Sequence, residues 1–376
     1  MVFFESFVTK IMYLNLFNIV MNKVMKKSVK VILFYFLITQ FLCFSENIEE
    51  FNKKIVALYS ENKIPEALTL GDEKLISLKQ REDVAGKLDA SSLMVILSVI
   101  YRKEGNFKKV EELLTDAMNI REKSIGLTDN LLNKILYNLA SLYKAQKRFS
   151  DSEVIYDKTL KSTEEIYGAR NSDVANVARS YSEVKISLEK YEEALALLNK
   201  AKEIIIKENS ENHYKTAEVL IDLGLLFEKL KKYNEAEENF LKSIAICEKV
   251  GGDKCDISIP LKRLALIYKE SGEYSKSESF YKRVLAIREK GFGENDLEVA
   301  DILHELGVVC SKQKKADAIT YLNKSKGIYE KLFGENHANI ALVLSDIEDY
   351  YDSIDNKEEA EVSRKKSEAI LLKTNK

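Results

Sequence analysis

The sequence predicts an all-α protein, an α-solenoid of about eight antiparallel helical hairpins, and three observations lead to this fold class. The 376 residues include only 14 glycines and 2 prolines, too few turn-forming residues for a sandwich or barrel of short strands. Hydrophobic residues make up 45% of the chain and charged residues 31%, which is typical of long helices with one wet face. A sequence pattern also recurs about every 42 residues through most of the chain.

The segment before the repeats has the features of an export signal. Residues 25–45 begin with a lysine-rich flank, followed by an uncharged and mostly apolar run at 31–44. A membrane-spanning helix needs about 20 apolar residues, so this shorter run fits the core of a signal peptide better. We therefore expect residues 25–45 to be a signal peptide and the protein to be exported, to the periplasm or the extracellular space.

Cleavage is expected after Ser45, because Cys43 and Ser45 supply the small side chains that a signal peptidase requires at these positions. Residues 1–24 fit poorly in front of a signal peptide, so we expect them to be an over-extended start of the reading frame. Three alternatives remain open: a buried helix at 31–44, a lipoprotein modified at Cys43, and a cytoplasmic protein without a signal.

Two anchor residues define the repeat. The first ends an apolar run and is usually aromatic; it is found at Tyr59, Tyr101, Tyr143, Lys185, Phe227, Tyr268, Cys310 and Tyr351. The second, eight or nine residues later, is usually small; it is found at Ala67, Val110, Ser152, Ala194, Ala236, Ser277, Ala318 and Ala360. Two anchors in phase predict an array over residues 46–376, with units near 48–87, 88–128, 129–171, 172–213, 214–255, 256–296, 297–338 and 339–374.

Each unit is expected to be a pair of helices. Leu220, Leu223 and Phe227 show the helical spacing of the first helix, and the small anchor lets the second helix approach closely. Gly105 and Gly272 mark the turn in two units. The second helix is expected to start with a capping box, in which an oxygen acceptor precedes a glutamate by three residues. The pairs are Ser150 with Glu153, Asn234 with Glu237, and Ser275 with Glu278.

The end of the unit carries a third signature, a glycine that fits a left-handed helix C-cap. It recurs at Gly126, Gly168, Gly252, Gly293 and Gly334. The following helix is expected to begin at a polar residue such as Asn295, three residues before Glu298.

Together these features resemble the tetratricopeptide repeat. Small residues precede the aromatic anchor by three, at Ala140, Gly224, Ala265 and Gly307, and Val299-Ala300 follows a glycine loop. The 42-residue period is similar to the kinesin-light-chain-type variant. The resemblance implies a right-handed solenoid whose first helices line a concave groove for a protein or peptide. The chain departs from the pattern at Lys185 and Cys310, and it lacks the histidine-proline pair that usually follows the glycine.

Little in the sequence indicates catalysis. His304-Glu305 is similar to the start of a zinc-protease motif, but Val308 occupies the place of the second histidine, so we expect no metal site and no cofactor. No nucleophile–base pair stands out, and the repeats leave no room for a catalytic domain. Cys310 is expected to be a buried small hydrophobe. Cys247 and Cys255 could form a local disulfide in an exported protein, or remain two free thiols.

The family resemblance places candidate ligand contacts six and nine residues before the aromatic anchor. Lys134, Tyr137, Asn176 and Arg179 are then expected to form one patch that binds an acidic or carboxyl-terminal peptide, because an arginine fork suits carboxylates. An ordinary solvated groove is the alternative. The equivalent positions in later units hold Ile221, Lys262 and His304.

The charge balance excludes some partners. The net charge is −2, and the array itself is more acidic than the lysine-rich amino terminus, so a general nucleic-acid binder is not expected. Contact with a membrane is expected only through an uncleaved amino-terminal segment. We therefore expect a non-catalytic interaction scaffold. The alternatives are a cytoplasmic regulatory scaffold and, as the weaker one, an enzyme-associated regulatory subunit.

Overall fold

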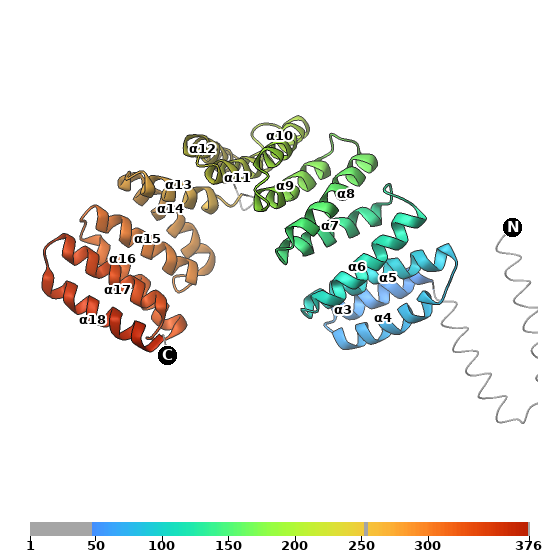
Figure 1. Cartoon of the computed structure of the whole chain (residues 1–376), viewed down its shortest axis with the longest axis horizontal. Coiled ribbons are helices and arrows are strands. Elements are labelled where there is room, and N and C mark those ends of the chain that lie inside the picture. Colours follow the sequence, from blue (N-terminus) through green and yellow to red (C-terminus); the bar gives the residue numbers. More distant parts are fainter. Residues whose placement is uncertain (1–46, 252–254, 375–376) are drawn as a thin grey trace, which may run out of the picture. The chain divides into compact units, whose positions relative to one another are not determined.

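The computed structural model describes residues 47–251 and 255–374, and over these residues it consists of sixteen α-helices without strands. The helices follow one another as antiparallel hairpins (Figure 1), which confirms the predicted all-α class. The expected signal peptide at 25–45 and the residues before it lie outside the described residues.

The chain divides into two compact units at Gly126 and Leu127, where the sequence shows one uninterrupted period. The first unit contains two hairpins: α3 (Ile48–Ser60) with α4 (Ile64–Lys79), and α5 (Val84–Lys103) with α6 (Phe107–Ser124). The second unit contains six: α7 (Asn130–Ala145) with α8 (Phe149–Tyr167), α9 (Ser172–Ser187) with α10 (Tyr191–Glu208), α11 (Tyr214–Lys229) with α12 (Tyr233–Val250), α13 (Ser258–Glu270) with α14 (Tyr274–Phe292), α15 (Leu297–Lys312) with α16 (Asp317–Phe333), and α17 (Ala338–Ser353) with α18 (Lys357–Thr374).

The small anchors are the points of closest packing within the hairpins. All eight side chains are at most 1% exposed, so the repeat position that the sequence singles out is fully buried. Two of the anchors are serines, and each satisfies its hydroxyl on the facing helix. Ser152 donates to the carbonyl of Ala140 at 2.8 Å, and Ser277 donates to the carbonyl of Ala265 at 2.7 Å. A buried hydroxyl is tolerated because it is bonded.

In two hairpins, a glycine on the first helix lies directly against a large side chain of the second helix, and no larger residue would fit there. A Cβ atom built on Gly224 would lie 2.5 Å from the ring of Phe240, and one on Gly307 would lie 2.5 Å from Leu322. Neither distance is compatible with an unshifted neighbour. These glycines therefore set the distance between the two helices of their hairpins.

The turn inside every hairpin needs one residue in the left-handed region. Gly105 and Gly272 occupy this position in two hairpins, as expected. In the other six hairpins the residue is not a glycine, although its φ lies between 54° and 61°. These residues are Asn62, Lys147, Glu189, Lys231, Lys314 and Asp355. A left-handed side chain costs about 1–2 kcal/mol, so the turn geometry is imposed by the packing of the two helices.

The capping boxes expected at the second helices are wrong. Helices α8, α12 and α14 begin two residues earlier than expected, and the side chains of their N-caps, Arg148, Lys232 and Glu273, accept no capping hydrogen bond. The glutamates serve the next hairpin instead. Glu153 accepts from Lys185 at 2.5 Å and Glu237 accepts from the hydroxyl of Tyr268, so each bonds the aromatic-anchor position one unit later.

Polar side chains cap the first helix of every hairpin except α13, whose N-cap is Ile257. Asp296, rather than the expected Asn295, accepts from the backbone N–H of Glu298 at 2.8 Å. His213 and His337 occupy the same position, and their Nδ1 atoms accept from Lys215 and Asn339 at 3.3 and 3.2 Å. The helix ends also match the expected C-caps, with one shift: the left-handed glycine after α12 is Gly251, whereas Gly252 lies outside the described residues.

Within the described part of the chain, α5 is the one helix long and apolar enough to cross a membrane by length and composition. Its side chains Ala90, Leu93, Met94 and Leu97 are at most 1% exposed, and the helix packs against α4 and α6. Packing inside the first unit thus accounts for the apolar character of α5.

Candidate functional site

The four residues of the expected ligand patch line one pocket. Lys134 and Tyr137 come from α7, and Asn176 and Arg179 come from α9, 42 residues later in the repeat. The pocket has a volume of about 570 Å³. Its other walls are Asn133, Asn138, Thr163, Tyr167, Asp173, Val177, Ser180 and Glu183. We call it the α7–α9 pocket.

Two of these side chains are available to a ligand. Lys134 and Asn176 are exposed, and neither has a hydrogen-bond or ion-pair partner among the residues that the structure describes. Tyr137 is half-buried, and its hydroxyl lies 3.1 Å from the hydroxyl of Ser180. The pocket therefore offers one ammonium group, one amide and a tyrosine face.

Arg179 is already paired within the protein. Its guanidinium donates to Asp222 at 2.6 Å and to Glu218 at 2.5 Å, both on α11. Burial opposes the charged form, but the two carboxylates outweigh it and raise the pKa of Arg179. Burial likewise raises the pKa of Asp222, with Arg179 acting against this effect. The fork that the sequence assigns to a ligand carboxylate is thus already paired with Glu218 and Asp222.

Three tyrosines make a rigid floor beneath the pocket. Tyr156 of α8 is fully buried, lies edge-on to Tyr137 with ring centroids 6.0 Å apart, and stacks on Tyr181 of α9 at 5.8 Å. Its hydroxyl lies 3.1 Å from that of Ser141. Because Tyr137 is held from below in this way, its face is presented to a ligand with little loss of side-chain entropy.

The three remaining candidates do not share this pocket. Ile221 is half-buried and packs against the core cluster that contains Leu261 and Leu264. His304 lies half-buried with its Nε2 atom 2.5 Å from a carboxylate oxygen of Asp346 on α17. Lys262 is exposed on α13 and lines a separate pocket of about 340 Å³.

A common contact links successive first helices. In each case, the side chain six residues before the aromatic anchor of one hairpin bonds the side chain five residues before the aromatic anchor of the next hairpin. We call this contact a rung. Three rungs are closed: Tyr137 with Ser180, Arg179 with Asp222, and His304 with Asp346. Groove residues chosen by repeat position are therefore in part cross-links between hairpins.

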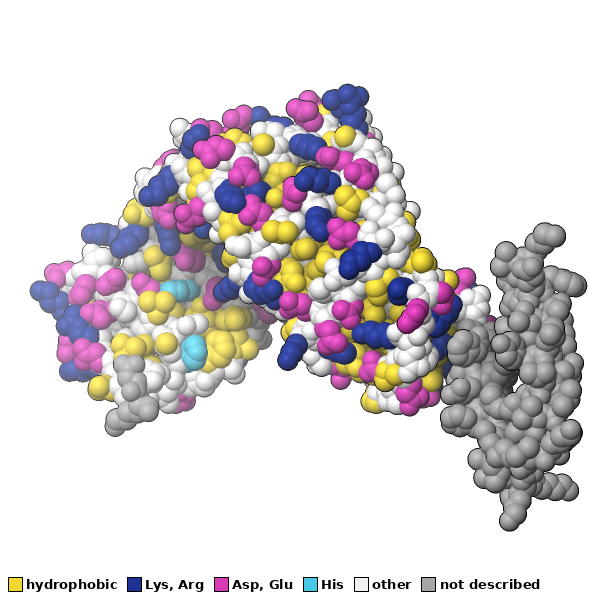
Figure 2. Space-filling model, turned by 45° about the vertical axis from the view of Figure 1, so that its right-hand side comes forward, with side chains coloured by type: hydrophobic (Ala, Val, Ile, Leu, Met, Phe, Trp, Pro, Cys, Tyr) yellow, Lys and Arg dark blue, Asp and Glu magenta, His cyan; other side chains and the backbone are white. Residues whose placement is uncertain are grey.

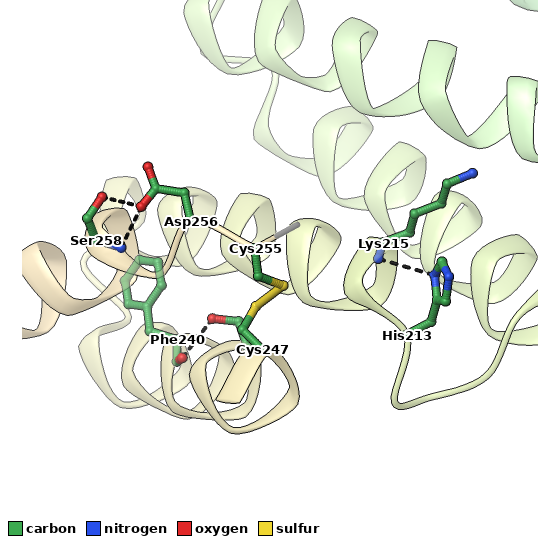
Figure 3. The surroundings of a disulfide bond; sticks show 8 residues. His213, Lys215, Phe240, Cys247, Cys255, Asp256 and Ser258 are labelled. Carbon is green, nitrogen blue, oxygen red and sulfur yellow. Dashed lines mark hydrogen bonds between the residues drawn. A yellow bond between two sulfur atoms is a disulfide. The ribbon is translucent and has the colours of Figure 1, made fainter. Parts of the chain in front are cut away.

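Cys247 and Cys255 are joined by a disulfide in the structure, with Cα atoms 5.5 Å apart (Figure 3). The bond ties the end of α12 to the segment that leads into α13. One residue further on, Asp256 accepts from the backbone N–H of Ser258 at 2.9 Å and so orients the start of α13. The remaining described cysteine, Cys310, is a buried free thiol, and burial raises its pKa to about 11.

The visible surface mixes charges of both signs. Figure 2 shows Lys and Arg side chains interspersed with Asp and Glu over the described helices, without a continuous field of one sign on this face. Over the described residues, no group of three or more His, Cys, Asp or Glu side chains could hold a metal ion.

A family model described as "Tetratricopeptide repeat" matches residues 131–207, 173–249, 215–290, 256–325 and 298–373, which together make up more than half of the chain. The chain belongs to the tetratricopeptide repeat family. Proteins of this family are generally interaction scaffolds and typically non-catalytic. The period of this repeat protein is that of the kinesin-light-chain-type form.

Similar proteins include one curated relative and two solved structures. A TPR repeat-containing protein of Dictyostelium discoideum is 24% identical over 195 residues, which are 50% of this chain and 11% of the relative. The chain thus spans about a tenth of that relative. BtubC (BKLC) from P. vanneervenii has a TM-score of 0.51 at 22% identity, covering 61% of this chain and 92% of that one. A putative kinesin light chain from Podosopora anserina has a TM-score of 0.47 at 15% identity, covering 54% and 95%.

Reasoning from the sequence of this repeat protein missed the second pocket. It is lined by residues of α13, α14 and α15, namely Ser258, Ile259, Lys262, Arg263, Leu266, Val284, Arg288, Glu298 and Ile302. Seven of them lie 125 residues after a residue of the α7–α9 pocket, so the two pockets occupy the same place in the repeat. We call it the α13–α15 pocket. The sequence would have indicated this pocket if the candidate positions on the first helix had been combined with the neighbouring positions on the second helix and on the first helix of the next unit.

Proposed function

We propose that the protein is a non-catalytic scaffold that binds a segment of another polypeptide, and that the α7–α9 pocket is one point of contact. The observation that carries the proposal is the gathering of unpaired Lys134 and Asn176 beside the braced face of Tyr137. An amide can donate to and accept from a peptide backbone, and a tyrosine face supplies contact area that is already rigid.

The pocket favours a polar rather than a strongly acidic segment. Lys134 is its one uncompensated cation among the described residues, and the carboxylate of Asp173 lines the same wall. Arg179 is neutralised by Glu218 and Asp222. Backbone hydrogen bonds and a single charged contact therefore account for recognition here.

The test is a selection of binding peptides from a displayed library with the purified protein, followed by affinity measurements on two variants. Lys134→Ala with Asn176→Ala removes the two available groups. The control, Lys324→Ala with Asn323→Ala, makes the same changes at exposed and unpartnered positions of α16. We expect at least tenfold weaker binding in the first variant and less than twofold change in the control. Equal affinities would remove the α7–α9 pocket from the account.

We further propose that the scaffold acts outside the cytoplasm. Support comes from the signal-like segment at 25–45 and from the disulfide between Cys247 and Cys255, because disulfides persist in oxidising compartments. Cell fractionation with amino-terminal sequencing tests this: a mature protein that starts at Glu46 in the exported fraction is expected. An intact amino terminus in the cytoplasm would support the cytoplasmic regulatory scaffold instead.

A further inference from the structure

The α13–α15 pocket differs from its repeat counterpart in the rung between its two first helices. Lys262 stands at the position from which Tyr137, Arg179 and His304 each reach the next hairpin. The facing acid in the next hairpin is Glu305, but it accepts from Lys269 at 2.7 Å and lies 3.3 Å from the hydroxyl of Tyr281. Lys262 therefore has no partner among the described residues, and the rung is open.

The rung on the other side of this pocket is open as well. Ile221 of α11 stands where a polar side chain would reach Arg263 of α13, and an aliphatic group cannot accept a hydrogen bond. Arg263 instead donates through one Nη atom to Glu228 at 3.2 Å, with its side chain 42% exposed. Its other N–H groups have no hydrogen-bond acceptor within the described part of the chain. Two consecutive open rungs leave donors of Lys262 and Arg263 side by side.

The third cation of the pocket, Arg288, is paired within the protein, so it helps to form the pocket wall but adds no free positive charge. Arg288 donates to Glu298 at 2.9 Å and to the hydroxyl of Ser258 at 2.5 Å, and it lies 3.4 Å from Asp256. The pocket thus carries an excess of positive charge at Lys262, shared with the exposed part of Arg263. One carboxylate, not a multiply charged phosphate, matches this excess.

Aliphatic side chains surround these cations. Ile259 is 44% exposed beside them, Leu266 lies half-buried one turn along α13, and Ile302 closes the pocket from α15. The residues at the positions of Ile259 and Leu266 three units earlier are Lys134, which lines the α7–α9 pocket, and Ser141, which does not, so this apolar wall is specific to the α13–α15 pocket. A ligand that fills the pocket must bring an aliphatic group next to its carboxylate.

We propose that the α13–α15 pocket is a second polypeptide site, which accepts a carboxylate adjacent to an aliphatic side chain. The carboxylate binds to Lys262 and Arg263, and the aliphatic group packs on Ile259 and Leu266. The inference rests on the proposed scaffold function, because it identifies the chemistry of a further contact. Either a chain terminus ending in leucine or an internal aspartate beside leucine supplies the same pair of groups.

Four fluorescein-labelled twelve-residue probes in a Gly-Ser background separate these sources by fluorescence anisotropy. One ends in leucine with a free carboxylate, and the second is its amide. The third is amidated and contains an internal Asp-Leu pair, and the fourth replaces that aspartate by asparagine. We expect binding of the first or the third probe, or both, and at least tenfold weaker binding of the neutral second and fourth.

Variants assign the binding to the pocket. Lys262→Glu is expected to weaken binding of the carboxylate probe at least tenfold, and Ile259→Ser about fivefold. Lys134→Glu makes the same charge change in the α7–α9 pocket and should change the affinity less than twofold. Both lysines are exposed and unpaired within the described residues, so an unchanged melting temperature is expected for both lysine variants.

The outcomes are distinct from those of the scaffold test. If library-selected peptides bind the protein but no carboxylate probe does, the second site is refuted and the scaffold stands. If the probes bind and Lys134→Glu removes the binding while Lys262→Glu does not, the pocket assignment is overturned. If neither selected peptides nor probes bind, the scaffold proposal and the second site both fail.

Discussion

The α7–α9 and α13–α15 pockets lie three hairpins apart at the same repeat positions, and their differences arise from a few substitutions. In the first, Tyr137 and Asn138 stand where the second has Lys262 and Arg263. The rung between the two first helices is closed in the first pocket, by Tyr137 and Ser180, whereas in the second pocket it is open at Lys262. A repeat position thus fixes where a side chain lies on the surface. Whether that side chain bonds the next hairpin or remains available to a ligand depends on the residues of the neighbouring unit.

The largest expected effect concerns the covalent tie beside the α13–α15 pocket. Replacing Cys247 and Cys255 by alanine should lower the free energy of unfolding by about 2–3 kcal/mol, because the bond closes a short loop, with a sequence separation of 8, in the unfolded chain. Chemical denaturation of the second unit measures this loss. Binding of carboxylate probes should weaken as well, since Asp256 and Ser258 next to the bond hold Arg288, whereas peptides at the α7–α9 pocket should be unaffected. A stability equal to that of the parent would contradict the role of the bond.

The closed rung of the α7–α9 pocket gives the next effect. Arg179→Ala should cost about 2 kcal/mol of unfolding free energy, because it leaves Glu218 and the half-buried Asp222 without their cation. Lys262→Ala at the open rung is the matched control and should stay within about 0.5 kcal/mol. Urea denaturation of both variants measures the two losses of unfolding free energy. Equal losses would mean that open and closed rungs do not differ energetically.

A pH profile compares Glu153 and Glu278, which lie 125 residues apart on α8 and α14, the second helices of the two pocket hairpins. Burial alone would raise the pKa of Glu278, but hydrogen bonds from Lys282, Lys315 and Gln313 lower it to about 2. The lowered pKa means that the stabilisation is complete above the unfolded pKa near 4.5 and is lost as the pH falls toward 2. With solvent screening, we expect a loss of about 1–2 kcal/mol.

Glu278→Gln should remove this part of the acid dependence, which thermal unfolding at several pH values would detect. Glu153, whose pKa is lowered by hydrogen bonds from Lys185 and Lys190, is the counterpart for the same substitution. An unaltered acid profile in Glu278→Gln would show that the lysine contacts do not stabilise the fold.

The smallest effect distinguishes the turns of the two pocket hairpins. Lys147 and Gly272 occupy the same left-handed position, with φ of 59° and 78°. Lys147→Gly should raise the free energy of unfolding by up to about 1 kcal/mol by relieving the left-handed side chain, and Gly272→Ala should lower it by about 1 kcal/mol. Differential scanning calorimetry resolves both shifts. A destabilised Lys147→Gly would mean that the entropy of the more flexible unfolded chain dominates.

The helical class, the repeat period and the buried anchor positions could be predicted from the amino-acid pattern alone. Anchors such as Ala236 and glycines such as Gly224 can be recognised in the sequence because only small residues fit where two helices pack closely. The sequence also placed Lys134, Tyr137, Asn176 and Arg179 at one site, since residues one period apart on first helices must lie side by side in a stacked array.

Only the tertiary structure decided which polar side chains remain available. Arg179 and Lys262 share a repeat position and a positive charge, yet Arg179 is paired with Glu218 and Asp222, while the acid that faces Lys262 is bound to Lys269. Likewise the glutamates expected to cap second helices bond the following hairpin, as Glu237 does with Tyr268. Such choices depend on contacts between units, because a long side chain can reach several partners and the geometry of the stacked helices selects among them.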